Sequence, residues 1–193
     1  MSAIIGILMA VRSLTIMAGF ATGDSSKVTF NQPQISVSKS SVTVNASLKN
    51  AVTDDMRKMA LAGTAIPLFV VVTLNSGSTK IPLAESKSMN ILLFDPLKGE
   101  FHVQRESAAE KSYKSIDEAF SDFVSFNNMH VCSLSVFSKE QSYVFKLQAL
   151  LGTAKVDALG GNTFDFMYYW DYKRPSIRTE PISGQLILYG GRK

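Results

Sequence analysis

The sequence predicts an α+β fold that is mainly β: an antiparallel β-sandwich or a strongly bent sheet with two packed helices. Apolar and polar residues alternate with a period of two in about nine or ten short segments. Turn residues separate these segments, and only two segments have helical spacing, too few for the crossovers of a parallel sheet. The 193 residues, 46% of them hydrophobic, suit one domain with an ordinary core.

Residues 1–23 form a long apolar stretch in which Arg12 is the only charged residue. Counted from Met9, the stretch has a basic start, a short apolar run and a small-residue end, the layout of a signal peptide with a cut before Asp24. The alternative is an uncleaved membrane anchor, whose apolar residues would offset roughly 2.5–3.5 kcal/mol for burying the arginine. The sequence therefore predicts a signal peptide or N-terminal membrane anchor over 1–23, and a single β-rich domain over 24–193.

We expect an exported protein that is periplasmic, or held at the inner membrane by residues 1–23. Removing that stretch takes away one basic residue of 20 and none of the 16 acidic residues, which leaves a charge of +3. This charge is too small, and the basic residues too scattered, to indicate nucleic-acid binding. The expected partner is an envelope or inner-membrane protein, and membrane contact is expected only through residues 1–23.

The first part of the domain predicts a hairpin, a helix and a strand. Segment 35–48 alternates apolar residues with Ser, Thr and Asn across a short turn, which indicates a hairpin with one buried face. Thr53 predicts the N-cap of a helix with two acids in its first turn, and Gly63 predicts its end. The β-branched segment 66–74 predicts a central strand covered on both faces, with Pro67 at its start.

The middle of the domain predicts three strands and a second helix. Segment 80–83 predicts a short strand, and segments 89–94 and 101–104 predict two strands joined by a turn that contains Pro and Gly. Ser115 opens a capping box, with Glu three residues later, and an apolar stripe follows at helical spacing. This second helix is predicted to end at residues 127–128.

The last part predicts four more strands. Two lie at 131–137 and 143–150, around a polar turn. Aromatic residues of one parity over 164–172 predict a long strand. Segment 185–189 predicts a final strand.

The aromatic residues of the long strand have two interpretations. Core packing explains them, since each ring can bury 150–250 Å². Alternatively, the end of the strand faces solvent, and Tyr168, Trp170 and Tyr172 form a binding site with Arg174 and Arg178 of the following loop. Aromatic and arginine side chains together suit a protein partner, a glycan or a lipid interface.

His130 and Cys132 are the candidates for catalysis. Side chains two positions apart on a strand share a face, and a Cys–His pair can generate a reactive thiolate. A free cysteine is more often buried and inert, so the sequence favours packing. The histidines and the cysteine have no spacing typical of a metal site, and no phosphate-binding or dinucleotide-binding motif occurs. No metal and no cofactor is expected.

Several segments, taken in order, resemble a family of uncharacterised exported bacterial proteins that is defined as a domain of unknown function. The resemblance rests on segments 60–68 (ALAGTAIPL), 95–103 (DPLKGEFHV) and 115–120 (SIDEAF), and on the region around Trp170. It covers most of residues 30–175. It implies export and a β-rich fold, and it supplies no activity and no catalytic residues.

The leading hypothesis for function is a non-enzymatic bacterial cell-envelope (periplasmic) interaction module. One alternative is a periplasmic carrier of a small apolar ligand, held in a cavity between the sheet and the helices. The other is an enzyme that uses His130 and Cys132 with a carboxylate.

Overall fold

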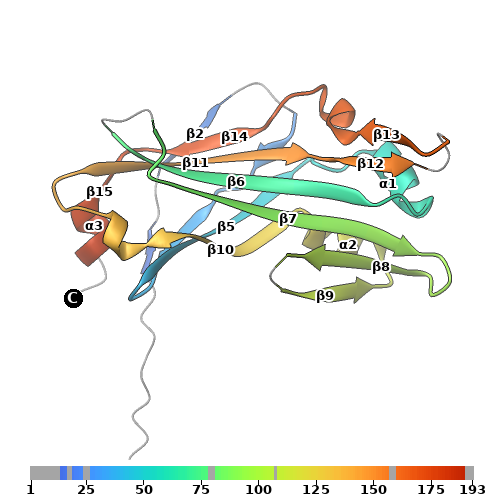
Figure 1. The fold of residues 1–193 in the computed structure, drawn as a ribbon, viewed down its shortest axis with the longest axis horizontal. Coiled ribbons are helices and arrows are strands. Elements are labelled where there is room, and N and C mark those ends of the chain that lie inside the picture. The colour runs from blue at the N-terminus through green and yellow to red at the C-terminus, as the bar shows by residue number, and fades with distance from the viewer. Residues whose placement is uncertain are drawn as a thin grey trace, which may run out of the picture.

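A computed structural model describes residues 14–16, 19–23, 27–77, 81–106, 108–156 and 160–189. These residues form two antiparallel sheets, a separate two-stranded hairpin and three short α-helices (Figure 1). The inner faces of both sheets contribute to one hydrophobic core. The structure confirms the predicted class, α+β and mainly β, with a curled antiparallel sheet as its largest element.

The large sheet has the strand order β2-β14-β11-β6-β7-β8-β9, and β15 pairs with β11. Its central strand β6 pairs with β7 on one side and with β11 on the other, and the three strands follow the long axis of the molecule (Figure 1). The strands are β2 (Phe20–Gly23), β6 (Ile66–Ser76), β7 (Ala84–Asp95), β8 (Glu100–Arg105), β9 (Ala108–Tyr113), β11 (Ser142–Leu151), β14 (Ser176–Thr179) and β15 (Ile182–Ser183).

The small sheet has the order β1-β4-β5-β10, and β3 pairs with β5. It contains the predicted hairpin, here β4 and β5. Its strands are β1 (Leu14–Ile16), β3 (Thr29–Phe30), β4 (Gln34–Val37), β5 (Ser41–Lys49) and β10 (Ser125–Ser133). A separate hairpin is formed by β12 (Thr153–Val156) and β13 (Asn162–Asp165).

The N-caps of the first two helices are those predicted from the sequence. Thr53 Oγ1 accepts a hydrogen bond from the backbone N of Met56 (3.2 Å), and Ser115 Oγ accepts one from Glu118 (3.5 Å). α2 packs against β7, β8 and β9. The helices are α1 (Asp54–Leu61), α2 (Ile116–Phe123) and α3 (Gly184–Tyr189), with short 3-10 helices η1 (Leu134–Val136) and η3 (Phe166–Trp170).

The two faces of the large sheet differ in burial. Along β6 the inner face carries Leu68, Val70 and Val72, all fully buried. The outer face carries Pro67 and Phe69 among others, which are only half-buried. Strand β6 is therefore apolar on both faces, but only the inner face lies in the core, so the prediction of a strand covered on both faces is wrong for the outer face.

The predicted long aromatic strand over 164–172 is wrong. The strand β13 ends at Asp165, whose carboxylate accepts a hydrogen bond from the backbone N of Met167 (2.9 Å) and starts η3. Trp170 Nε1 then donates to the carbonyl oxygen of Ala51 (2.9 Å). This distant partner fixes a helical turn where the sequence pattern alone is typical of a strand.

The predicted last strand over 185–189 is also wrong, because this segment forms α3. The helix begins at Gly184, whose backbone N donates to the carbonyl of Gln141 (2.8 Å). A Cβ on Gly184 would collide with the carbonyl of Ser138. Close packing against the loop before β11 therefore determines the conformation of this end of the chain.

The second helix ends at Phe123, earlier than the predicted 127–128, and β10 begins at Ser125. The side-chain amide of Asn90 donates to the carbonyls of both residues, at 2.8 Å and 3.0 Å. The hydrogen bonds from Asn90 replace those that a longer helix would give these carbonyls, and β10 follows in place of further helix.

Of two other predicted strands, one has different bounds and the described part of the other is not a strand. Over 131–137, β10 ends at Ser133 and η1 follows. Of 80–83, residue 80 lies outside the described residues, and residues 81–83 precede β7 without forming a strand.

The predicted signal or anchor covers residues 1–23, of which 1–13 and 17–18 lie outside the described residues. Within it, β1 pairs with β4 and β2 pairs with β14. Across the described residues, no helix has the length and hydrophobicity to span a bilayer. A signal peptide or anchor at this position stays a prediction.

Candidate functional site

An apolar groove of about 540 Å³ lies on the outer face of the large sheet. Its floor is built from β11, β6 and β7, where Leu150 pairs with Phe69 and Phe69 pairs with Met89. The next row of the floor places Pro67 opposite Ile91. Directly paired residues point to the same side of a sheet, so these five side chains form one continuous apolar surface. We call this surface and its walls the apolar groove.

Gly152 allows one wall of the groove to approach the floor. Its backbone N donates to the carbonyl of Pro67 (2.8 Å), and its carbonyl accepts from the backbone N of Phe166 (3.1 Å). A Cβ at this position would lie 2.8 Å from Phe69 Cε2 and 2.8 Å from Pro67 Cγ. The absence of a side chain therefore lets the β12–β13 hairpin and η3 stand beside β6.

The wall is held by η3. Met167 is buried, and its sulfur accepts a hydrogen bond from the backbone N of Leu151 (3.2 Å). Ala154 of β12 also lines the groove and is half-buried. The wall is thus anchored to β11 by backbone and sulfur contacts.

Arg174 is exposed and lines the groove. It follows a turn in which Asp171 and Tyr172 both have a left-handed backbone (φ 51° and 58°). Such angles are uncommon for residues other than glycine. Here the backbone N of Tyr172 donates to the carbonyl oxygen of Met167 (2.9 Å), and the backbone N of Lys173 donates to the carbonyl oxygen of Trp170 (2.9 Å). An ordered turn therefore sets the position of the arginine.

Other cations share the outer face. The ammonium of Lys87 lies 4.2 Å from the ring centroid of Phe69, a cation–π contact. Arg178 of β14 pairs directly with Lys146 of β11, and both are exposed. Among the described residues, no carboxylate forms an ion pair with Arg174, Lys87, Arg178 or Lys146. In the described part of this face these cations therefore form no ion pair, although the carboxylates of Glu85 and Asp165 lie on the same side.

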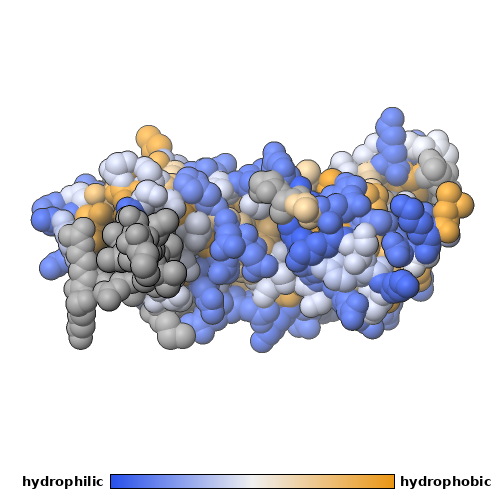
Figure 2. Space-filling model, turned by 90° about the horizontal axis from the view of Figure 1, so that it is seen from below, coloured by the Kyte–Doolittle hydropathy of each residue, from blue (hydrophilic) through white to orange (hydrophobic). Residues whose placement is uncertain are grey.

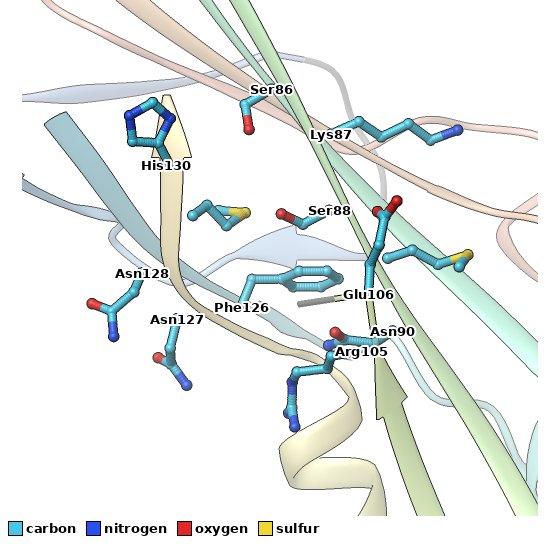
Figure 3. Close-up of a pocket in the computed structure, with 12 residues that line it drawn as sticks. Ser86, Lys87, Ser88, Asn90, Arg105, Glu106, Phe126, Asn127, Asn128 and His130 are labelled. Carbon is cyan, nitrogen blue, oxygen red and sulfur yellow. The ribbon is translucent and has the colours of Figure 1, made fainter. Parts of the chain in front are cut away.

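A second, more polar cleft of about 340 Å³ lies between β7 and β10. Figure 3 shows Ser86 and Ser88 of β7 and Phe126 of β10 directed into the space between the strands, whereas Asn127 and Asn128 point away from β7. Small serines stand on the inner face of β7 where the rest of the sheet has larger apolar residues, which leaves the cleft open.

The charged and amide groups at one end of this cleft have structural partners. Asn90 is 2% exposed and bonds the carbonyls at the junction of α2 and β10. Arg105 Nη2 lies 2.6 Å from Asp122 Oδ2 and donates to the backbone oxygen of Asp122 (3.0 Å). Burial opposes ionisation of Asp122, but contacts with Arg105 and Tyr113 and the charges of Arg105 and Lys111 outweigh it and lower its pKa. These groups hold α2 against the sheet.

His130 and Cys132 do not share a face, although alternation along a regular strand would place them on one, and Cys132 is buried as the sequence favours. A β-bulge falls between them: His130 pairs with Thr43 and Cys132 pairs with Val42. His130 is therefore exposed at the polar cleft, while Cys132 is buried in the core. Burial also raises the pKa of the Cys132 thiol to about 11. The described residues contain no group of three or more His, Cys, Asp or Glu side chains that could hold a metal ion.

The five residues of the predicted binding site separate into different environments. Trp170 is buried and bonded to the segment before α1. Tyr168 and Tyr172 are exposed, at 60% and 63%. Arg174 lines the apolar groove and Arg178 lies on the outer face of β14. Of the five, only Arg174 is among the residues that line the groove.

The floor of the groove was not predicted as a site. Phe69 and Pro67 belong to a segment that the sequence correctly assigns to a strand, and the available signal was its second apolar face, which was predicted to be covered. Leu150 and Met89 join them only through the pairing of strands distant in sequence.

On the side of the molecule shown in Figure 2, the visible hydrophobic residues are dispersed. Figure 2 shows the molecule from the side of β8 and β9, turned from the view of Figure 1. Where its atoms are coloured, this side is mostly hydrophilic, with hydrophobic residues in small separate groups. An apolar partner has no extended surface on the coloured part of that side.

The fold and the groove define a mainly β protein with an open apolar site on a curled antiparallel sheet. The sequence model of the family described as Domain of unknown function (DUF4390) matches residues 25–170. The chain belongs to this family. No curated protein and no solved structure matches the chain.

Proposed function

We propose that the protein is a non-catalytic binding module of the bacterial cell envelope, and that the apolar groove is its binding site. The observation that carries the proposal is the outer face of the large sheet, where Phe69, Leu150 and Met89 form a continuous half-buried apolar floor. A groove of about 540 Å³ is within the range of small-ligand sites. The export and periplasmic location belong to the proposal and rest on the apolar stretch at residues 1–23.

The groove combines two of the sequence hypotheses, an interaction module and a carrier of a small apolar ligand. The carrier hypothesis placed its cavity between the sheet and the helices. The groove instead lies on the outer face, since the inner face is filled by the core and α2. All residues that line it fall within 65–174, so removal of residues 1–23 takes away none of them.

Two observations speak against the Cys/His enzyme. The bulge in β10 separates His130 from Cys132, and a thiol with a pKa of about 11 carries very little thiolate at neutral pH. The polar cleft is also the weaker binding candidate, because Asn90 and Arg105 already have partners that hold α2 in place.

The binding site is tested with the neutral fluorescent probe N-phenyl-1-naphthylamine. We expect saturable fluorescence enhancement with the purified full-length protein, and loss of most of it in Phe69→Ser. The matched control is Leu97→Ser, which removes a 97% exposed leucine from the β7–β8 turn. Circular dichroism verifies that both variants fold. Equal probe binding by the two variants would show that the groove is not the site.

The location is tested by fractionation of a Gram-negative host with intact mass measured on each fraction. A soluble periplasmic form that starts near Asp24 supports a cleaved signal, and a membrane-bound form of full mass supports an anchor. A full-length cytosolic product would contradict the envelope assignment. In a cleaved form β1 and β2 are absent, so β4 and β14 become sheet edges.

A further inference from the structure

We infer that the apolar groove holds a single-chain anionic lipid, with its acyl chain on the floor of β11, β6 and β7 and its phosphate head at Arg174. This inference rests on the proposed function and adds the chemical class of the ligand. Three observations carry it: the shape of the floor, the arginine at the groove, and the charge of the surrounding face.

The floor suits one acyl chain. It crosses three strands and includes two rows of side chains along them, which corresponds to about 10 Å by about 7 Å at ordinary strand spacings. Phe69, Leu150, Met89, Pro67 and Ile91 contribute only apolar side chains to it, and each is half-buried. A chain lying across this floor would exclude water from these side chains, which is favourable in proportion to the area covered.

Arg174 supplies a matching group for the head. A guanidinium presents several donors in one plane and binds phosphate in a bidentate manner. Among the described residues Arg174 has no ion-pair partner, although Asp165 also lines the groove. The carboxylate of Asp165 instead accepts from Met167 as the cap of η3. The arginine is therefore free to bind an anion that the protein does not itself provide.

The turn before Arg174 is a second, independent feature of this end of the groove. Two consecutive residues, Asp171 and Tyr172, hold left-handed backbone angles. Such angles are uncommon for residues other than glycine and are concentrated at functional sites. The turn brings Arg174 to the groove immediately after η3, which forms the wall.

The surrounding face favours an anion over a neutral ligand. Lys87 lies over the Phe69 ring, and Lys146 and Arg178 face the same side. Glu85, which pairs with Thr73 on this face, and Asp165, which lines the groove, are opposing charges, and neither forms an ion pair with these cations in the described part of the chain. With Arg174, the four named cations outnumber these two carboxylates, and the remaining positive charge attracts an anionic head and repels a cationic one.

The inference is tested by displacement of N-phenyl-1-naphthylamine from the full-length protein at low salt. Three competitors are compared: dodecyl phosphate below its micelle concentration, dodecanol below its solubility limit, and inorganic phosphate. We expect dodecyl phosphate to displace the probe at about three- to tenfold lower concentration than dodecanol, and this preference to shrink in 1 M salt. Inorganic phosphate alone should not displace it.

Variants of neighbouring basic residues provide matched controls. Arg174→Gln should remove the preference for dodecyl phosphate while the probe itself still binds. Arg174→Lys should keep part of the preference. Lys173→Gln removes the same charge from the adjacent exposed residue, which does not line the groove, and should keep the whole preference.

Each contrary result has a distinct meaning. If the probe does not bind the wild-type protein, the proposed function fails and the lipid inference with it. If the probe binds but both dodecyl compounds displace it equally, or the preference survives in Arg174→Gln, only the lipid inference is overturned. It is also overturned if inorganic phosphate competes as well as dodecyl phosphate. The same holds if the protein sediments with anionic vesicles but does not bind the monomeric amphiphile, since the site is then a membrane surface.

Discussion

Replacing Trp170 with phenylalanine separates a packing role of this side chain from a binding role. The indole is 4% exposed, and its Nε1 donates to the carbonyl of Ala51 at 2.9 Å. The substitution leaves that buried carbonyl without its donor, at a cost of about 1–3 kcal/mol. The lost ring atoms add about 1 kcal/mol. We therefore expect the free energy of unfolding to fall by about 2–4 kcal/mol.

The assay is urea unfolding followed by circular dichroism, since the chain has a single tryptophan and the variant loses its fluorescence signal. With a slope of about 3 kcal/mol/M, the midpoint should fall by about 1 M. Tyr168→Phe is the control, because Tyr168 lies in the same 3-10 helix but is 60% exposed, and its midpoint should hardly change. An unchanged midpoint in Trp170→Phe would refute the anchoring role derived from the structure.

Three further predictions follow from the core and the groove. Cys132 should react with iodoacetamide roughly 100-fold more slowly in the native protein at pH 7 than in urea, because burial raises its pKa from 9.0 to about 11; equal rates would contradict its burial. Asp122→Asn should be less stable than the wild type at neutral pH. Because the folded-state pKa of Asp122 lies below 3.8, this difference should disappear as the pH falls below 3.8, and a difference constant with pH would contradict the charge contacts. Gly152→Ala should lower the unfolding free energy by about 1–3 kcal/mol and weaken probe binding, because its Cβ would displace Phe69 and Pro67. Thermal unfolding and a probe titration measure the two effects. If both results match the wild type, the wall of the groove tolerates a side chain at this position.

Much of the fold depends on local patterns and could be predicted. The N-caps at Thr53 and Ser115 form as expected because a cap needs only a side-chain oxygen and the next turn of the same helix. The turn after β7 also forms, with Asp95 accepting from the backbone N of Leu97 (2.9 Å) and Gly99 in the left-handed region. These features are decided within a few residues.

The wrong elements depend on partners far away in sequence. The segment that ends in Trp170 has the alternation of a strand, but it forms a 3-10 helix in which Trp170 bonds to the distant Ala51. The segment after Gly184 is too apolar to distinguish a strand from a helix, and contact with Ser138 decides it. A period-two pattern indicates which side chains are apolar, and it does not show which elements they meet.

The candidate site was predictable in part. Arg174 was selected because it stands next to aromatic residues, and it does line the groove. The floor was missed because it depends on register: Phe69 faces Leu150 and Met89 only after β6 has paired with both neighbours. The bulge that separates His130 from Cys132 has no clear signal in the sequence.

The pairing of β6 with β11 also determines when the groove can exist during synthesis of the chain. Ser76 pairs with Tyr143, and Leu68 pairs with Leu151. Because α2 and β10 lie between β6 and β11 in the sequence, β6 can pair with β11 only after both of these elements have been synthesised. Contacts of such long sequence separation form slowly and late in folding. A ligand on this floor binds only the complete sheet, so it stabilises the finished fold by mass action and distinguishes a full chain from one that stops before β11.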